Sequence, residues 1–335
     1  MPKSLVNILT YLITLGLGIF LIWLSIKDLK PEDIEKIKFA VKKANYVLLI
    51  PILIMGFISH WSRAVRWTYL MEPMGFKPSV TNTTFAVFIG YLANLAFPRL
   101  GEVLKCTLLA RYEKVPADKL VGTIIAERAF DMLCLLIIFI LTIVTQTDLA
   151  SDYLASLWDR FNQSSDNGNV PGKGIWVLLF VAICTLSIFI FRKRIAQSKF
   201  ATRFREVLLN VGKGILSFRT MKNKRGFVLH TLLIWSMYFG MILLGFQSIQ
   251  ETSHLGYKTG LSVLSFGSVG MIVTPGGLGA YTALVQEIVS LYGIEKAISV
   301  AISWIIWLVP TLIIILGGVL SFIFLPFVNK NRNVK

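Results

Sequence analysis

The sequence predicts an all-α membrane protein, a polytopic helix bundle of about six full spans plus two re-entrant or broken helical segments. The first reason is composition, since 55% of the 335 residues are hydrophobic and only 16% are charged. Soluble domains are about 45–50% apolar, with about a quarter of residues charged. The second reason is that most apolar runs approach or exceed the roughly 20 residues that a spanning helix needs. In chain order these runs are Leu5–Ile26, Tyr46–Ser59, Met132–Thr145, Ile175–Phe191, Phe227–Phe246 and Ile298–Phe327.

The first run, Leu5–Ile26, is predicted to be a retained span. The sequence SIKDLK that follows it lacks the small-x-small site of a cleaved signal peptide. Next, Lys27–Asn45 is predicted to form a short amphipathic helix along the membrane interface. Proline and acidic residues stand near its start, and Ile34, Ile37 and Val41 share one face.

The distribution of charge predicts the orientation. The net charge of +16 comes from 34 Lys and Arg against 18 Asp and Glu. Residues 192–226 carry eleven Lys or Arg and one acidic residue, whereas residues 146–172 carry four Asp and one Arg. Basic loops stay cytoplasmic, so 192–226 and both termini are predicted inside, and 146–172 outside. Such basic segments attract anionic lipid headgroups, so we expect lipid partners and no nucleic acid.

The stretch Asn94–Lys105, NLAFPRLGEVLK, interrupts an apolar run. A full crossing over 83–98 would put the next basic loop outside and would reverse the orientation of 146–172 and 192–226. A segment that enters from the cytoplasm and turns back at Pro98–Gly101 removes both conflicts. In this interpretation residues 60–82 lie on the cytoplasmic side.

A second interruption lies in GSVGMIVTPGGLGAYTALV, at Pro275, Gly276, Gly277 and Gly279. Paired broken segments are typical of inverted-repeat transporters, whose site lies between the repeats. The predicted halves are 1–145 and 173–326. The alternative is that two Pro/Gly patches arose by chance.

Ionisable residues gather around the first interruption and the apolar segment after it. Such residues are costly in a membrane and point to function. On a helix Glu127 and Asp131 share a face, and Arg128 can pair with Asp131. The alternative is a purely structural network in which Arg99 pairs with Glu127 and Arg128 with Asp131. The group comprises Arg99, Glu102, Glu127, Arg128 and Asp131.

Arg63 and Arg66 stand three apart in SHWSRAVRWTYL, beside Trp61, Trp67 and Tyr69. One interpretation is a phosphate clamp, because guanidinium groups grip phosphate oxygens with paired hydrogen bonds. The other is an interfacial aromatic belt with snorkelling arginines.

The glycines of the second interruption also allow two interpretations. Their backbone N–H groups could face a cavity and bind an anion, or the glycines could only permit close helix packing. Glu287, on the next apolar helix, could face the same cavity.

Enzyme and metal motifs are absent from the sequence. GKG at 212–214 lacks the spacing of a phosphate loop, and neither HExxH nor a nucleophile elbow occurs. The three cysteines and three histidines are scattered and show no metal-ligand spacing. We therefore expect no enzyme activity, no catalytic residue, no metal and no cofactor.

Four short motifs follow one another along the chain: RW at Arg66–Trp67, PRLGE at Pro98–Glu102, ERAFD at Glu127–Asp131 and PGGLG at Pro275–Gly279. In order and approximate spacing they resemble the lysylphosphatidylglycerol synthase/flippase transmembrane-domain family over nearly the whole chain. In that family the domain is regarded as an integral membrane, flippase-like module, which can be joined to a cytoplasmic aminoacyltransferase domain. The resemblance implies a single domain of this kind over residues 1–335.

Carried over residue by residue, the resemblance implies a lipid-handling role for the motif residues. Two features depart from the family. The aminoacyltransferase domain is missing, so aminoacyl transfer is not expected, and AYTA follows the glycine motif where an acidic residue is frequent, which leaves the substrate open. The implied substrate-binding residues are Arg66, Arg99, Glu102, Glu127, Arg128, Asp131, Pro275, Gly276, Gly277 and Gly279.

The expected function is therefore lipid translocation in a cell membrane, specifically a bacterial inner membrane. A phospholipid or modified phospholipid headgroup would cross through a central polar cavity where the two broken segments meet. The alternative is a membrane partner that transports nothing and presents lipid or polyprenyl-phosphate substrates to a separate transferase.

Overall fold

The computed structural model describes residues 3–97, 100–146, 218 and 221–330. Over these residues the chain is helical and contains no strand, as the sequence predicts. The run Ile175–Phe191, the loop 146–172 beyond its first residue, most of 192–226 and the residue pair 98–99 lie outside the described residues. The α-helices are α1 (Lys3–Ile26), α2 (Pro31–Lys43), α3 (Leu49–Met71), α4 (Val80–Ala96), α5 (Leu100–Glu113), α6 (Ala117–Thr145), α11 (Lys224–Gln247), α12 (Tyr257–Val273), α13 (Ala280–Leu291) and α14 (Lys296–Val328).

Three helical stretches within the described residues are long and apolar enough to cross a membrane: Tyr46–Met74, Lys224–Gln247 and Lys296–Val328. The first consists of α3 with a short 3₁₀ turn at each end, η1 (Tyr46–Leu48) and η2 (Glu72–Met74). A fourth span results if α1 and α2, which meet at a bend of 104°, are counted as one. The helical membrane class is therefore confirmed, and the number of spans in the whole chain stays a prediction.

Helix α2 forms where the amphipathic pattern predicts it, with Pro31 in its first turn and acidic residues beside it. Part of its apolar surface packs on the rest of the protein. Ile37 and the buried Ala40 contact the core, whereas Ile34 and Val41 are 44% and 36% exposed. Its position along a membrane interface stays a prediction.

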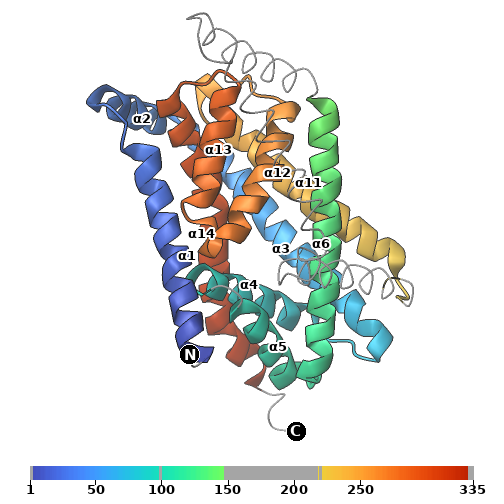
Figure 1. Cartoon of the computed structure of the whole chain (residues 1–335). Coiled ribbons are helices and arrows are strands. Elements are labelled where there is room, and N and C mark those ends of the chain that lie inside the picture. Colours follow the sequence, from blue (N-terminus) through green and yellow to red (C-terminus); the bar gives the residue numbers. More distant parts are fainter. Residues whose placement is uncertain (1–2, 98–99, 147–217, 219–220, 331–335) are drawn as a thin grey trace, which may run out of the picture.

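Two helical hairpins lie in the bundle, one at each predicted interruption. In each, two consecutive helices pack against one another, α4 against α5 and α12 against α13. These helices have 17, 14, 17 and 12 residues, fewer than the ~20 of a full crossing. Figure 1 shows α4 and α5 in the half of the molecule where α14 ends, and α12 and α13 in the opposite half. The structure thus contains two short hairpins in opposite halves, while the repeat boundaries at 1–145 and 173–326 stay a prediction.

The turn of the second hairpin, η4 (Pro275–Gly277), needs glycine for its backbone. Gly276, Gly277 and Gly279 have φ of +59°, +74° and +76°, values that residues with a Cβ rarely adopt. A Cβ on Gly276 would also lie 2.5 Å from Cδ2 of Leu95, near the end of α4. The turn of the second hairpin therefore touches the end of α4 in the first hairpin.

Gly101 has a different role, because it already lies inside α5 and its φ is not positive. A Cβ on Gly101 would lie 1.9 Å from the carbonyl oxygen of Gly90 in α4. The N–H of Gly101 donates to Oδ1 of Asn94 at 2.8 Å. The predicted turn at Pro98–Gly101 is thus two residues too long at its end, because α5 begins at Leu100, and Gly101 permits close helix packing.

Trp307 of α14 holds the second turn in place, since its Nε1 donates to the carbonyl oxygen of Gly276 at 2.9 Å. Trp307→Phe is expected to lower the free energy of unfolding by about 1 kcal/mol, because the carbonyl loses its buried donor. Thermal unfolding in detergent measures this change. Trp23→Phe is the matched control, because Trp23 is 53% exposed. Equal midpoints for both variants would contradict the assigned role.

Candidate functional site

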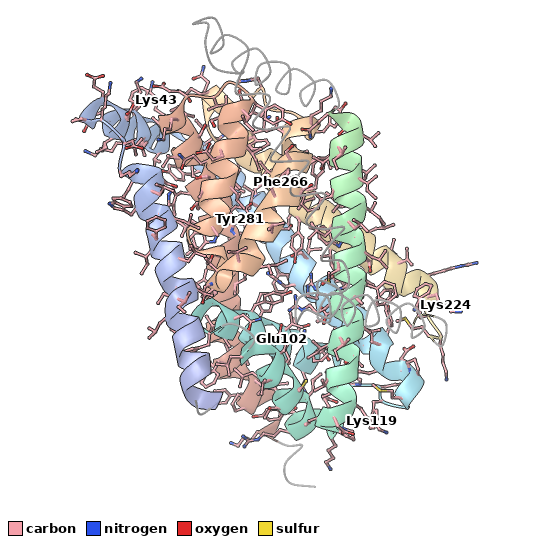
Figure 2. All side chains as sticks on the ribbon, in the orientation of Figure 1. Lys43, Glu102, Lys119, Lys224, Phe266 and Tyr281 are labelled. Atoms are coloured by element: carbon pink, nitrogen blue, oxygen red, sulfur yellow. The ribbon has the colours of Figure 1, made fainter. Side chains whose placement is uncertain are left out.

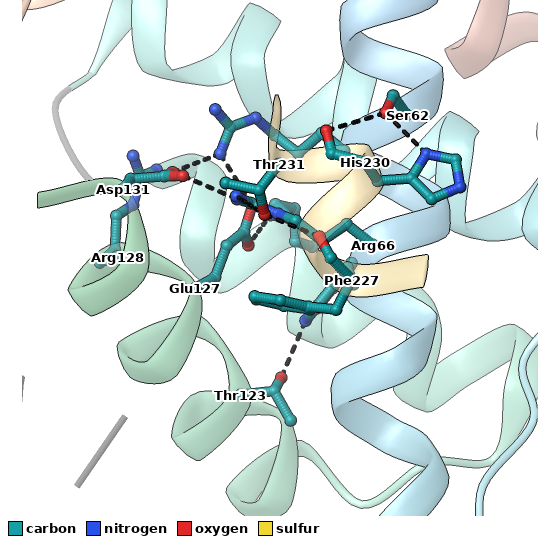
Figure 3. Close-up of polar contacts among 12 residues, drawn as sticks. Ser62, Arg66, Thr123, Glu127, Arg128, Asp131, Phe227, His230 and Thr231 are labelled. Carbon is teal, nitrogen blue, oxygen red and sulfur yellow. Dashed lines mark hydrogen bonds and ion pairs between the residues drawn. The ribbon is translucent and has the colours of Figure 1, made fainter. Parts of the chain in front are cut away.

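Two helices bring opposite charges together in the interior. Arg63 and Arg66 lie one turn apart on α3, and Glu127 and Asp131 lie one turn apart on α6. Figure 3 shows both carboxylates pointing from α6 toward Arg66. The 3.6-residue period of the helix places each pair on a single face, so two arginines meet two carboxylates.

The distances show a closed network of ion pairs. Nη1 of Arg63 lies 2.9 Å from Oε1 of Glu127 and 2.5 Å from Oδ2 of Asp131. Nη2 of Arg66 lies 2.8 Å from Oδ1 of Asp131 and 3.5 Å from Oε1 of Glu127. Arg63, Arg66 and Glu127 are 4%, 0% and 1% exposed, so these charges are removed from solvent.

Lys105 of α5 joins the network from a third helix, with its Nζ 3.1 Å from Oε2 of Glu127. Its aliphatic chain passes Gly90 of α4, where a Cβ would approach Cγ of Lys105 to 2.6 Å. The ammonium lies 4.3 Å from the ring centre of Trp67, and the Trp67 indole donates to Thr123 at 2.8 Å. The small residue at position 90 therefore makes room for a buried cation.

Helix α11 completes the site with neutral groups. Nη1 of Arg66 donates to Oγ1 of Thr231 at 3.3 Å, and Nη2 of Arg63 donates to the hydroxyl of Tyr238 at 3.4 Å. Three buried nitrogens beside these contacts have no hydrogen-bond partner within the described part of the chain: Nε of Arg63, Nε of Arg66 and Nδ1 of His60. Buried polar groups in proteins are nearly always paired, so donor capacity is left over here.

Arg128 and Glu102 form a separate ion pair at the edge of the cluster, 3.0 Å apart. Their side chains are 45% and 27% exposed. Figure 2 shows Glu102 between the end of the molecule that carries Lys43 and the end that carries Lys119. This pair is the part of the charged group that is most open to the surroundings.

The structure brings together three of the residues selected from the sequence, Arg66, Glu127 and Asp131. The predicted pair of Arg128 with Asp131 is wrong, because Arg128 pairs instead with Glu102 of α5, in the first hairpin. The predicted pair of Arg99 with Glu127 stays a prediction, because Arg99 lies outside the described residues. Pro98 lies outside them as well.

Two residues of the cluster, Arg63 and Lys105, are absent from the residues carried over from the family motifs. Helical spacing offers a signal for both. Arg63 precedes Arg66 by three residues and Lys105 follows Glu102 by three, so each shares a face with a selected residue.

The position of the arginines also differs from the sequence-based prediction. Helix α3 continues twelve residues past Ser59, to Met71, instead of ending in a cytoplasmic loop. Arg66 and Trp67 are both 0% exposed, so their side chains lie in the interior of the helix bundle. The snorkelling interpretation is therefore wrong for Arg63 and Arg66.

The glycine-rich turn at Pro275–Gly279 lies apart from the charged cluster. Its described neighbours from other elements include Leu95, Trp307 and the carbonyl oxygen of Gly18. None of the contacts found in the described residues links Pro275, Gly276, Gly277 or Gly279 to the charged cluster. Glu287 is exposed on α13, and the suggestion that it faces the same cavity stays a prediction.

Comparison with known families identifies the chain. The family model described as "Lysylphosphatidylglycerol synthase TM region" matches residues 8–318. The chain belongs to this family. Comparison with curated proteins and with solved structures found no match. Family membership and the three span-length helices together establish a membrane protein of a lipid-associated family.

Proposed function

We propose that this member of the lysylphosphatidylglycerol synthase transmembrane family is a lipid translocase. The observation that carries the proposal is the buried cluster of Arg63, Arg66, Lys105, Glu127 and Asp131 between α3, α5 and α6. Ionisable groups inside a membrane are costly and mark substrate pathways. Guanidinium groups with unused N–H donors suit a lipid phosphate.

The arrangement of the hairpins supports the same function. Short helices that turn inside a membrane are tolerated where protein or a wet cavity surrounds them. Here the two hairpins occupy opposite halves, and the end of α4 touches the turn of the second hairpin at Leu95 and Gly276. We propose that one half rocks against the other around this contact and opens the cluster alternately to the two sides, while the acyl chains stay in the bilayer.

The headgroup needs an entrance, and the Glu102–Arg128 pair is the best candidate. The inner residues Arg63, Arg66 and Lys105 are at most 4% exposed, whereas Arg128 is accessible. In the proposed mechanism the lipid phosphate replaces Glu102 at Arg128, α5 moves away from α6, and the phosphate then reaches the inner arginines.

Arg128→Gln is expected to lower the transport rate about tenfold or more, because it removes one charge-assisted hydrogen bond from the entering phosphate. The assay uses vesicles reconstituted with the purified protein and headgroup-labelled phosphatidylglycerol, with an impermeant quencher to report lipid in the outer leaflet. Stability should change little, because a half-exposed ion pair contributes at most ~1 kcal/mol.

The matched control is Lys296→Gln. Lys296 is 47% exposed and pairs with Asp28, so it loses the same charge at a distant ion pair and should transport normally. Equal rates for Arg128→Gln and the parent protein would contradict the proposed entrance. Vesicles with the parent protein that move lipid no faster than empty vesicles would favour the alternative, a partner that presents lipid to a transferase.

A further inference from the structure

The buried cluster contains more positive than negative charge. Among the residues that the structure describes, Arg63, Arg66 and Lys105 pair with Glu127 and Asp131, three positive charges against two negative charges, which leaves one positive charge. The outer pair of Arg128 and Glu102 is balanced and does not change this result. An uncompensated charge away from water is strongly unfavourable, so the site lacks one negative charge.

Both carboxylates of the cluster are already paired with cations. Oε1 of Glu127 contacts both arginines and Oε2 contacts Lys105. Oδ1 of Asp131 contacts Arg66 and Oδ2 contacts Arg63. A headgroup amine would therefore find no uncompensated negative charge among these groups and would bring a second uncompensated positive charge.

Donors, by contrast, remain free. Nε of Arg63 and Nε of Arg66 have no hydrogen-bond partner, although both side chains are at most 5% exposed. A phosphate oxygen accepts from such groups in a strong, charge-assisted bond. The same group supplies the missing negative charge.

We propose that this site selects lipids whose headgroup is a phosphate with net negative charge and discriminates against headgroups that add an amine. The proposal deepens the proposed function, on which it rests for the assumption that lipid reaches the cluster. In the bound state the phosphate lies against Arg63 and Arg66, and Lys105 provides the charge that makes the cluster cation-rich.

The test is equilibrium binding of lipids to the purified full chain in detergent, measured by titration with native mass spectrometry. Phosphatidylglycerol is expected to bind about tenfold or more tightly than phosphatidylethanolamine, because both lipids offer the same phosphate and only phosphatidylethanolamine adds an amine, which the surplus positive charge repels. Phosphatidic acid is the phosphomonoester probe and should also bind more tightly than phosphatidylethanolamine. Displacement of phosphatidylglycerol by an equal concentration of inorganic phosphate would overturn the assignment to a lipid.

Lys105→Gln tests the role of the surplus charge. This substitution leaves the two arginines balanced by the two carboxylates, so the preference for phosphatidylglycerol should fall to about twofold or less. Lys119→Gln is the control; Lys119 is an exposed cation near the start of α6, and its removal should leave the preference unchanged. If Lys105→Gln does not fold, Lys105→Met removes the same charge and keeps an unbranched chain beside Gly90, so it should reduce the preference in the same way.

Two results separate this inference from the translocase proposal. Equal affinity of the parent protein for phosphatidylglycerol and phosphatidylethanolamine, or an undiminished preference in Lys105→Gln, would overturn the selectivity. Selective binding in a protein that moves no lipid in vesicles would support the selectivity and overturn translocation.

Discussion

Glu127→Gln is expected to lower the free energy of unfolding by about 3–5 kcal/mol, the range for breaking a buried ion pair by removing one partner. The side chain keeps its shape but loses its charge, and three cations depend on that charge: Arg63, Arg66 and Lys105. The measurement is the unfolding midpoint in detergent, together with the yield of monodisperse protein. Glu287→Gln, exposed on α13, is the matched control and should behave as the parent protein does.

The companion variant Lys105→Gln makes this prediction more specific. It removes a positive charge from a site that has one too many, so it should destabilise the protein less than Glu127→Gln does. Equal decreases in the free energy of unfolding for the two variants would indicate that stability depends on side-chain packing in the cluster and not on its charge balance.

Gly101→Ala is expected to prevent the first hairpin from closing. Its new Cβ would lie 1.9 Å from the carbonyl oxygen of Gly90, and a backbone atom cannot move aside as a flexible side chain can. Overpacking of a close contact costs about 1–3 kcal/mol or more, and here Lys105, one turn further along α5, would be displaced from Glu127 as well. We expect a lower unfolding midpoint and loss of selective lipid binding together.

Gly122→Ala is the control for Gly101→Ala. Gly122 also lies inside a helix, α6, and a Cβ there meets no atom within 4 Å. Alanine favours a helix over glycine by up to ~1 kcal/mol, so this variant should be as stable as the parent protein or slightly more stable. A Gly101→Ala protein as stable as Gly122→Ala would show that α4 and α5 do not need their close contact.

Local sequence features predicted several parts of the candidate site correctly. The four-residue spacing of Glu127 and Asp131 places them on one face of α6, as observed. The Pro/Gly stretch at Pro275–Gly279 interrupts its apolar run and forms the turn of a hairpin. These predictions succeeded because helix periodicity and the φ preference of glycine act within a few residues of the chain.

Other parts depend on contacts between distant segments. Arg63 and Glu127 are 64 residues apart, and Arg128 could pair in principle with either Asp131 or Glu102. Which pair forms depends on how closely α5 approaches α6, and the position of α5 depends on the Gly90–Gly101 contact. The burial of Arg66 could not be predicted either, because its hydrophilic surroundings in the sequence resemble those of an interfacial loop.

The sequence by itself determined that this chain is a helical membrane protein with two interrupted segments, because hydrophobicity, periodicity and backbone preference are local properties. The tertiary structure alone decided that Arg63, Arg66 and Lys105 share two carboxylates, and hence that the cluster has a surplus positive charge. The net charge of a buried site is the sum of side-chain charges from several helices, and only tertiary packing brings those helices together.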